Sequence, residues 1–447
     1  MSTAAPRTSA GPLLTDDDHA LLLRLLRTPT AGPLEAGHDA PLQLWEAQRA
    51  YADAARSAGL RPIHHAAPAA EALRRDDVPA TVRAAAHDPG FLAAQPSLVL
   101  RLGPDRPVRD TVMFNVHLDT VAGTQPVTFD GVRFTGRGAV DAKGPAVALL
   151  AGVRAAAARE PAVGRDISVL VQAVGGEEGG AMGTFGTRPL VEAGFIGRLN
   201  VFCEPTGLHH LPRATASMTA RITVRGDDAV DDRPGTGHNA TVLLGFLAQH
   251  VAAAFDSHPE RADATGAPCI AGLHTGHAHN RVYGSGDLLV NVPYTSTAEG
   301  QAAARALKDT VAAGVREFTA RFAGSRTCGR TAADAAALTS LGWDKRGLPC
   351  LSGGGTGEGG DPWAEAVLAA AGIPCRPADE PAFTCDAIWL HGVPGTYTTV
   401  LGPGTLDANN AHAEGEFVDL ADLDAFAAQV SRLLTAFARR RTGQRQA

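Results

Sequence analysis

Residues 111–144 read TVMFNVHLDTVAGTQPVTFDGVRFTGRGAVDAKG and bring one imidazole and two carboxylates together. The apolar run VMFNV predicts a buried strand, and His117 and Asp119 follow where that strand ends. Because residues i and i+2 of an extended chain point the same way, Asp119 can fix the tautomer of His117 while the other ring nitrogen faces a metal. Asp141 lies in the turn that opens an apolar helical segment with a proline in its first turn, so we expect its carboxylate to be displayed and not packed.

Later strand-like runs are also followed by candidate metal ligands. The runs at 166–174, 199–203 and 398–404 lead, in this order, into segments that carry Glu177 and Glu178, then Glu204, then His412 with Glu416. Adjacent carboxylates are costly unless their charge is neutralised, and a divalent cation neutralises it. Two imidazoles with several carboxylates and no cysteine suit zinc or a similar metal, with two ions that share a bridging carboxylate.

These segments resemble a known family of zinc metallopeptidases and amidohydrolases, which includes acetylornithine deacetylase, succinyl-diaminopimelate desuccinylase, aminoacylase and carboxypeptidase G. The signals HLDT, GRGAVDAKG, GGEEGG, EPT and GPG followed by AH and E occur in the family's order, between about Leu21 and Phe437. The match therefore extends over nearly the whole chain.

The resemblance implies a role for each candidate residue. Two zinc ions are expected per chain, with cobalt or manganese as alternatives. Glu177 would be the general base, Asp119 would orient His117, and the peptide bond after Asp141 would be cis, as is typical of the family. The first zinc would be held by His117, Asp141 and Glu204, and the second by Asp141, Glu178 and His412.

The composition of the chain indicates a folded globular protein. The chain has 447 residues, 45% of them hydrophobic and 19% charged, which is typical of a folded protein with two or so domains. The net charge of −7 offers no basic surface for nucleic acid and no drive toward anionic membranes. Six dispersed cysteines without a CxxC pair indicate reduced thiols in the cytoplasm. The first residues, MSTAAPRTSAGP, predict a disordered tail and not a secretory signal.

Helical segments alternate with short strands from Ser97 to Cys203, which predicts an α/β domain whose sheet is covered by helices. The pattern changes after Pro212, where alternating strands flank a helical segment and predict an α+β insert at residues 214–328. We thus expect a catalytic domain in two parts, 1–213, with residues 1–12 disordered, and 329–447. The resemblance implies a three-layer metallopeptidase domain with a mixed sheet, and an inserted lid or dimerisation domain through which the chain forms a homodimer.

The insert departs from the family pattern at two places. Many relatives have a histidine that polarises the scissile carbonyl, whereas this chain has Val230 at the matching position. The arginine that often binds the substrate carboxylate is Pro293 here. We expect His238 to replace the histidine and Arg281, beside the family-like Asn280, to replace the arginine.

Together the residues and the resemblance predict a hydrolase that cleaves the amide bond of an N-acyl amino acid or a small peptide-like substrate. Two alternatives stay open. The enzyme is a dipeptidase or performs a specialised amide-processing step in small-molecule biosynthesis, or the chain is a non-catalytic binding protein with a vestigial metal site. The ligands alone cannot distinguish the substrates, because contacts from the insert select them.

Overall fold

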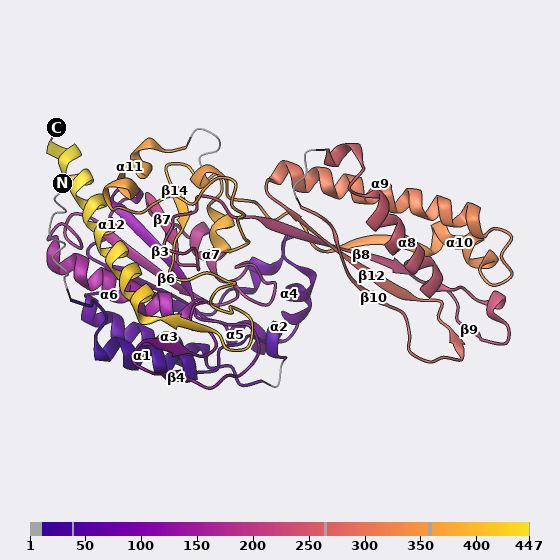
Figure 1. Ribbon diagram of the computed structural model, residues 1–447, viewed down its shortest axis with the longest axis horizontal. Coiled ribbons are helices and arrows are strands. Elements are labelled where there is room, and N and C mark those ends of the chain that lie inside the picture. Colours follow the sequence, from indigo (N-terminus) through magenta and orange to yellow (C-terminus); the bar gives the residue numbers. More distant parts are fainter. Residues whose placement is uncertain (1–10, 38–39, 263–265, 356–359, 447) are drawn as a thin grey trace, which may run out of the picture. The chain divides into compact units, whose positions relative to one another are not determined.

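The computed structural model describes residues 11–37, 40–262, 266–355 and 360–446, and it divides into two compact units (Figure 1). The first unit comprises residues 1–74, 85–213 and 351–447, and the second comprises 75–84 and 214–350. The predicted tail lies outside the described residues except at positions 11 and 12. No described helix combines the length and the apolar character that a membrane span requires.

The first unit is built on a mixed six-stranded sheet in the order β1-β2-β6-β3-β7-β14, in which β6, β3, β7 and β14 are parallel. Its strands are β1 (Arg61–Ala66), β2 (Ser97–Leu102), β3 (Thr111–His117), β6 (Ser168–Val174), β7 (Leu199–Phe202) and β14 (Tyr397–Val400), with a small sheet of β4 (Thr128–Phe129), β5 (Arg133–Thr135) and β15 (Phe417–Asp419). Its helices are α1 (Asp16–Arg27), α2 (Pro33–Ala36), α3 (Leu44–Ala55), α5 (Pro89–Ala93), α6 (Lys143–Arg159), α7 (Thr187–Glu192), α11 (Pro362–Ala370) and α12 (Leu420–Gln446).

Helices cover both faces of this sheet, since every residue of β3 and β6 is buried. Phe114 and its neighbours at alternate positions join the main hydrophobic core, which also contains the apolar residues of α6 and α12. Asn115 points to the opposite face, where its amide donates to the hydroxyl of Thr187 in α7. The predicted α/β class with a helix-covered mixed sheet is confirmed.

Close packing fixes α6 against α12, which lie side by side in Figure 1. A Cβ atom at Gly152 would collide with the backbone of Ala427 and the side chain of Val430. The helix α1 begins at a capping box in which Thr15 and Asp18 exchange hydrogen bonds, and its buried leucines face α6. These helices hold the sheet on which the site is built.

The second unit contains an antiparallel sheet in the order β10-β12-β8-β13. Its elements are α4 (Ala80–Ala85, at the boundary), β8 (Ala216–Val224), β9 (Ala229–Val230), α8 (Ala240–Ala254), β10 (Cys269–His274), β11 (Arg281–Val282), β12 (Gly286–Tyr294), α9 (Thr297–Phe322), α10 (Gly329–Leu338) and β13 (Thr339–Lys345). Alternate residues of β8 and β12 are buried, as expected for a sheet with helices on one face.

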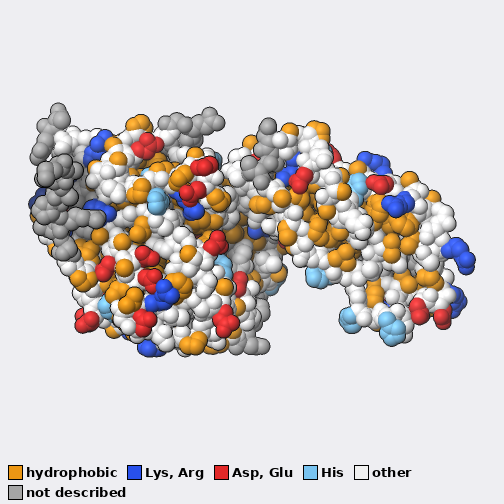
Figure 2. All heavy atoms as spheres, in the orientation of Figure 1, with side chains coloured by type: hydrophobic (Ala, Val, Ile, Leu, Met, Phe, Trp, Pro, Cys, Tyr) orange, Lys and Arg blue, Asp and Glu red, His pale blue; other side chains and the backbone are white. Residues whose placement is uncertain are grey.

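The unit extends beyond the predicted insert at 214–328. The strand β13 pairs with β8 along its length, from Thr339 opposite Val224 to Lys345 opposite Thr219. Residues 329–350 therefore belong to the inserted unit and not to the returning catalytic chain. On the face shown in Figure 2, acidic and basic side chains are interspersed over the surface of each unit.

Candidate metal centre

The parallel strands of the first unit end at one edge of the sheet. His117, the last residue of β3, is level with Val174, the last residue of β6, and Asn115 is level with Phe202, the last residue of β7. The strand β14 ends level with β7, because Val400 pairs with Phe202. The segments that follow these four strands therefore start side by side, which explains why ligands from distant parts of the sequence meet here.

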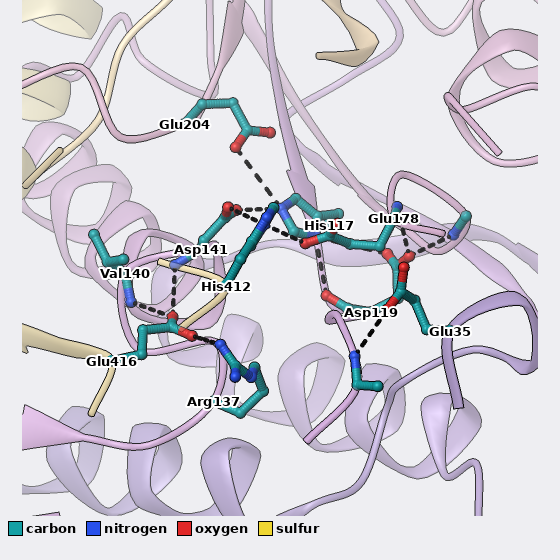
Figure 3. A network of polar contacts seen from close by, with 12 residues as sticks. Glu35, His117, Asp119, Arg137, Val140, Asp141, Glu178, Glu204, His412 and Glu416 are labelled. Atoms are coloured by element: carbon teal, nitrogen blue, oxygen red, sulfur yellow. Dashed lines mark hydrogen bonds and ion pairs between the residues drawn. The ribbon is translucent and has the colours of Figure 1, made fainter. Parts of the chain in front are cut away.

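Five of the predicted residues converge at this edge (Figure 3). Asp141 lies between the two imidazoles, with Oδ1 2.8 Å from His117 Nε2 and Oδ2 3.1 Å from His412 Nε2. His412 Nε2 is also 3.0 Å from Glu178 Oε1, and His117 Nε2 is 3.7 Å from Glu204 Oε2. One carboxylate that faces both histidines is the arrangement that a bridging ligand needs.

The protonation of His117 shows that this cluster fits a cation. Its Nδ1 donates to the backbone carbonyl oxygen of Asp119 at 3.0 Å, so in the neutral ring the lone pair is on Nε2. That lone pair faces the carboxylates of Asp141 and Glu204 in a fully buried place. Acceptors that face one another need a proton or a metal between them, and imidazole with carboxylate oxygens is a donor set that suits zinc.

Burial and charge perturb the acids of the cluster. Burial would raise the pKa of Asp141, but the close contacts with the imidazoles of His117 and His412 outweigh it and hold this pKa below its usual range. Burial raises the pKa of Glu178 to about 7. Burial, together with the neighbouring Glu178, raises the pKa of Glu177 well above its usual value. The site thus holds more carboxylates than its histidines neutralise, which favours a bound cation.

Glu177 differs from its neighbours in having no hydrogen bond or ion pair to any residue that the structure describes. It is partly buried and follows Gly176, whose φ of 77° and close approach to Phe185 require a glycine. The loop therefore turns sharply after β6 and leaves the Glu177 carboxylate available beside the ligands.

Asp119 acts through its backbone and its side chain separately. Its backbone carbonyl accepts the hydrogen bond from His117, whereas its nearest carboxylate oxygen is 3.6 Å from that ring, beyond hydrogen-bond distance. The other carboxylate oxygen accepts the N–H groups of Gly176 at 3.0 Å and Glu178 at 3.1 Å. The Asp119 side chain thus fixes the loop of Glu177 and Glu178, and the orientation of His117, which we had expected from this carboxylate, comes from the main chain.

Glu416 supports the centre in a way that the sequence did not reveal. It is buried, and its Oε1 accepts the N–H groups of Val140 at 3.1 Å and Asp141 at 3.3 Å. Its Oε2 is 2.8 Å from Arg137 Nη1 (Figure 3). The sequence indicated Glu416 as a carboxylate near His412, but not its contacts with the main chain at Val140 and Asp141. The predicted cis peptide between Asp141 and Ala142 is present.

The substrate-binding residues predicted from the sequence lie in the second unit. His238 is buried and uses both ring nitrogens: Nδ1 accepts the N–H of Asp227 at 2.8 Å, and Nε2 is 3.1 Å from Asp334 Oδ2. Arg281 pairs with Asp228 at 2.5 Å. His238 therefore has no free ring nitrogen with which to replace the missing histidine.

The positions that depart from the family pattern also lie in this unit. Val230 is exposed and pairs with Arg281 across the short β9–β11 ladder. Pro293 lies in β12, opposite Ser217 of β8. Asn280 is exposed and precedes β11.

A sheet edge that presents two histidines, a shared aspartate and an unpaired glutamate defines a metal-dependent hydrolase. The chain belongs to peptidase family M20/M25/M40, whose sequence profile matches residues 113–436. It is an enzyme of the peptidase and amidohydrolase type, which confirms the expected family and class of reaction.

Individual relatives agree with this assignment. A protein of Aeropyrum pernix named as a LysW-lysine/LysW-ornithine hydrolase is 35% identical over 152 residues, which cover 34% of this chain and 40% of that protein. The aminopeptidase PepT of Bacillus cereus superposes with a TM-score of 0.65 at 15% identity, over 95% of this chain and all of that one. The metallo-carboxypeptidase Sso-CP2 of Sulfolobus solfataricus gives 0.66 at 10% identity with the same coverage.

A third structure, the YXEP protein of Bacillus subtilis, is described as a dinuclear metal binding peptidase. It superposes with a TM-score of 0.60 at 11% identity, over 94% of this chain and 97% of that one. At these identities the likeness of the solved structures shows the fold alone.

Proposed function

We propose that this chain is a di-zinc hydrolase that cleaves the amide bond of an N-acyl amino acid or a small peptide-like substrate. The observation that carries the proposal is the contrast within one cluster, where Asp141 contacts both histidines while Glu177 stays unpaired beside them. A bridging carboxylate and a free general base are the two parts that metal-assisted hydrolysis requires.

The residues divide into two ligand sets that share Asp141. His117 and Glu204 would complete the first, and Glu178 and His412 the second. Zinc, when bound, supplies Lewis acidity and lowers the pKa of a water molecule toward neutrality. Cobalt and manganese are alternative ions for the same donors.

Glu177 performs the proton transfers. Its carboxylate accepts a proton from the attacking water and then delivers that proton to the leaving nitrogen, so the products are an amine and a carboxylate. Asp119 keeps Glu177 in place by holding the main chain on both sides of it, at Gly176 and Glu178.

A second candidate is a specialised amide-processing step or a dipeptidase reaction. The departures at Val230 and Pro293 favour it, because valine cannot polarise a carbonyl and proline cannot bind a carboxylate. The name of the Aeropyrum relative, a hydrolase of LysW-linked lysine or ornithine, adds amides of basic amino acids to the substrates that we would try.

The test combines metal analysis with a substrate panel. Wild-type protein is expected to carry about two zinc ions and to release amine from at least one N-acyl amino acid, dipeptide or acylated lysine. Asp141→Ala is expected to lose both metal and turnover, because it removes the shared ligand. Metal-loaded wild-type protein that turns over no amide in the panel would contradict the proposed substrate class, and protein that binds no metal would contradict the centre itself.

The free edge of one strand and the state of the cysteines bear on the oligomeric state and the cellular location of the protein. We propose a homodimer formed through the inserted unit, whose outer strand β10 has a free edge among the described strands. We also propose a cytoplasmic location, since all six cysteines are free thiols. Light scattering on the full chain and on a protein with Ile270→Lys in β10 tests the dimer, which should dissociate in the variant.

A further inference from the structure

A cavity of about 410 Å³ in the first unit lies beside the metal centre and has no part in the reaction described above. None of the six residues assigned to metal binding or proton transfer lines it. Its walls come from the end of α1, the segment after it, and the loop between β3 and β4. The volume is within the range of pockets that bind small molecules.

The lining of the cavity is basic. Arg27 and Arg137 line it together with Lys143, whose pKa burial lowers to about 7, and none of the described lining residues is acidic. Leu26, Pro29 and Val127 supply apolar walls. Cations at one place and apolar surface at another favour a small anion that carries an apolar group.

The guanidinium of Arg137 is paired through one of its nitrogens, which contacts Glu416 (Figure 3). Nη1 donates to Glu416 Oε2 at 2.8 Å. Nε is buried without a hydrogen-bond partner, and Nη2 makes no hydrogen bond to any described residue. The free edge formed by Nε and Nη2 is the one that receives a carboxylate through two parallel hydrogen bonds.

A second buried polar atom also lacks a partner. Thr30 lines the cavity with only 1% of its surface exposed, and its hydroxyl makes no hydrogen bond among the described residues. A buried hydroxyl without a partner costs free energy that a bound ligand would recover. Arg137 and Thr30 thus bring two unsatisfied donors to the lining of one cavity, where a single ligand can satisfy both.

We propose that this cavity binds a small monocarboxylate with an apolar group, whose carboxylate is held by the Nε and Nη2 edge of Arg137 with the Thr30 hydroxyl as a further donor. The lining of this cavity includes neither the assigned metal ligands nor Glu177, and the proposal does not depend on which amide the enzyme cleaves.

The cavity is connected to the metal centre through two of its lining residues. Arg137 holds Glu416, which in turn holds the backbone N–H of the shared ligand Asp141. Gln125 accepts the N–H groups of Gly415 and Glu416 and donates to the carbonyl of Ala413, next to His412. A ligand that immobilises Arg137 therefore steadies Glu416 and, through it, the separate segments that carry Asp141 and His412, so carboxylate binding and metal retention are expected to be coupled.

The binding test is calorimetric titration of the full-length enzyme with sodium benzoate at constant ionic strength, and the expected result is one saturable site. Thr30→Val preserves the shape of the side chain but removes the hydroxyl, so benzoate should bind about fivefold more weakly. Arg27→Ala should weaken binding about threefold. Arg24→Ala is the matched control, since Arg24 lies on the same helix but does not line the cavity.

A carboxylate can also bind directly to zinc, so the titration is repeated on chelator-treated enzyme. Benzoate binding that persists without metal and weakens in Thr30→Val supports the cavity. Binding that disappears with the metal, or that is unchanged in both Thr30→Val and Arg27→Ala, would overturn the proposal. Inorganic phosphate that binds as tightly as benzoate would show a general anion site and overturn the assigned ligand class.

The coupling has its own measurement, which needs no turnover. Saturating benzoate should slow the loss of zinc to a chelator about fivefold in wild-type enzyme and less in Thr30→Val. An unchanged rate at saturating benzoate would overturn the coupling.

Discussion

The metal centre of the first unit and the paired side chains of the inserted unit use polar groups in different ways. At the metal centre, His117 and the surrounding carboxylates direct hydrogen-bond acceptors toward one another. Their repulsion is relieved only when a cation lies between them. In the insert, the polar groups that the sequence had suggested for substrate binding, and several others, pair with one another instead. Arg221 binds Asp344 through two hydrogen bonds of 3.0 and 2.7 Å, and both nitrogens of His238 are occupied.

The difference indicates which polar residues serve function. Groups that lack partners in the folded chain carry a free-energy cost that a ligand relieves, whereas groups that satisfy one another stabilise the fold. This criterion predicts that Glu177 and the candidate metal ligands act in the reaction, and that His238 and Arg281 serve the structure of the insert. The predictions below test that division, beginning with the largest effect.

Glu177→Gln is expected to lower kcat about a thousandfold, because glutamine keeps the shape of the side chain but cannot accept the proton from water. Zinc content, measured by elemental analysis, should stay at the wild-type level, since Glu177 is not assigned as a ligand. Glu414→Gln is the matched control, an exposed glutamate near His412 whose side chain makes no hydrogen bond among the described residues. Comparable kcat values for the two variants would remove Glu177 from its role as base.

Asp119→Ala should weaken zinc binding by roughly tenfold to a hundredfold, as is typical when a residue that supports metal ligands is removed. It should also lower the free energy of unfolding by about 2 to 4 kcal/mol, because the N–H groups of Gly176 and Glu178 lose their acceptor. Competition with a fluorescent chelator measures the first effect and denaturant titration the second.

Asp119→Asn separates the two functions of that side chain. The amide oxygen can still accept hydrogen bonds from the loop, so most of the stability should return, whereas the negative charge beside His117 is lost and zinc binding stays weaker than in the wild type. Wild-type zinc affinity in Asp119→Ala would show that the loop of Glu177 and Glu178 needs no support from this carboxylate.

Four of the five candidate ligands are recognisable in the sequence because they follow an apolar run that predicts a strand. Parallel strands bring such ends to one edge, and the register of β3, β6, β7 and β14 shows how this happens for His117, Glu178, Glu204 and His412. Asp141 was found by a different signal, the turn GRGAVDAKG.

Other features depend on contacts that no local pattern encodes. The burial of Glu416 under Asp141 joins positions 275 residues apart, and the hydrogen bonds from Asp119 to the loop at Gly176 span 57. The boundary of the insert was placed too early, because β13 is recognisable as a part of it only through its pairing with β8. The pairing of His238 with Asp334, likewise, depends on a partner 96 residues away.

His238→Ala, in the insert, is expected to change kcat by less than about threefold while lowering the free energy of unfolding by about 1 to 3 kcal/mol, because the N–H of Asp227 loses its acceptor. Steady-state kinetics on the best amide of the panel and denaturant titration measure the two effects on one preparation. A hundredfold fall in kcat with little change in stability is the size expected for removing a donor that polarises the scissile carbonyl. That outcome would show that His238 acts in substrate binding and that a paired side chain can leave its partners during turnover. Pairing within the insert would then no longer distinguish structural residues from functional ones.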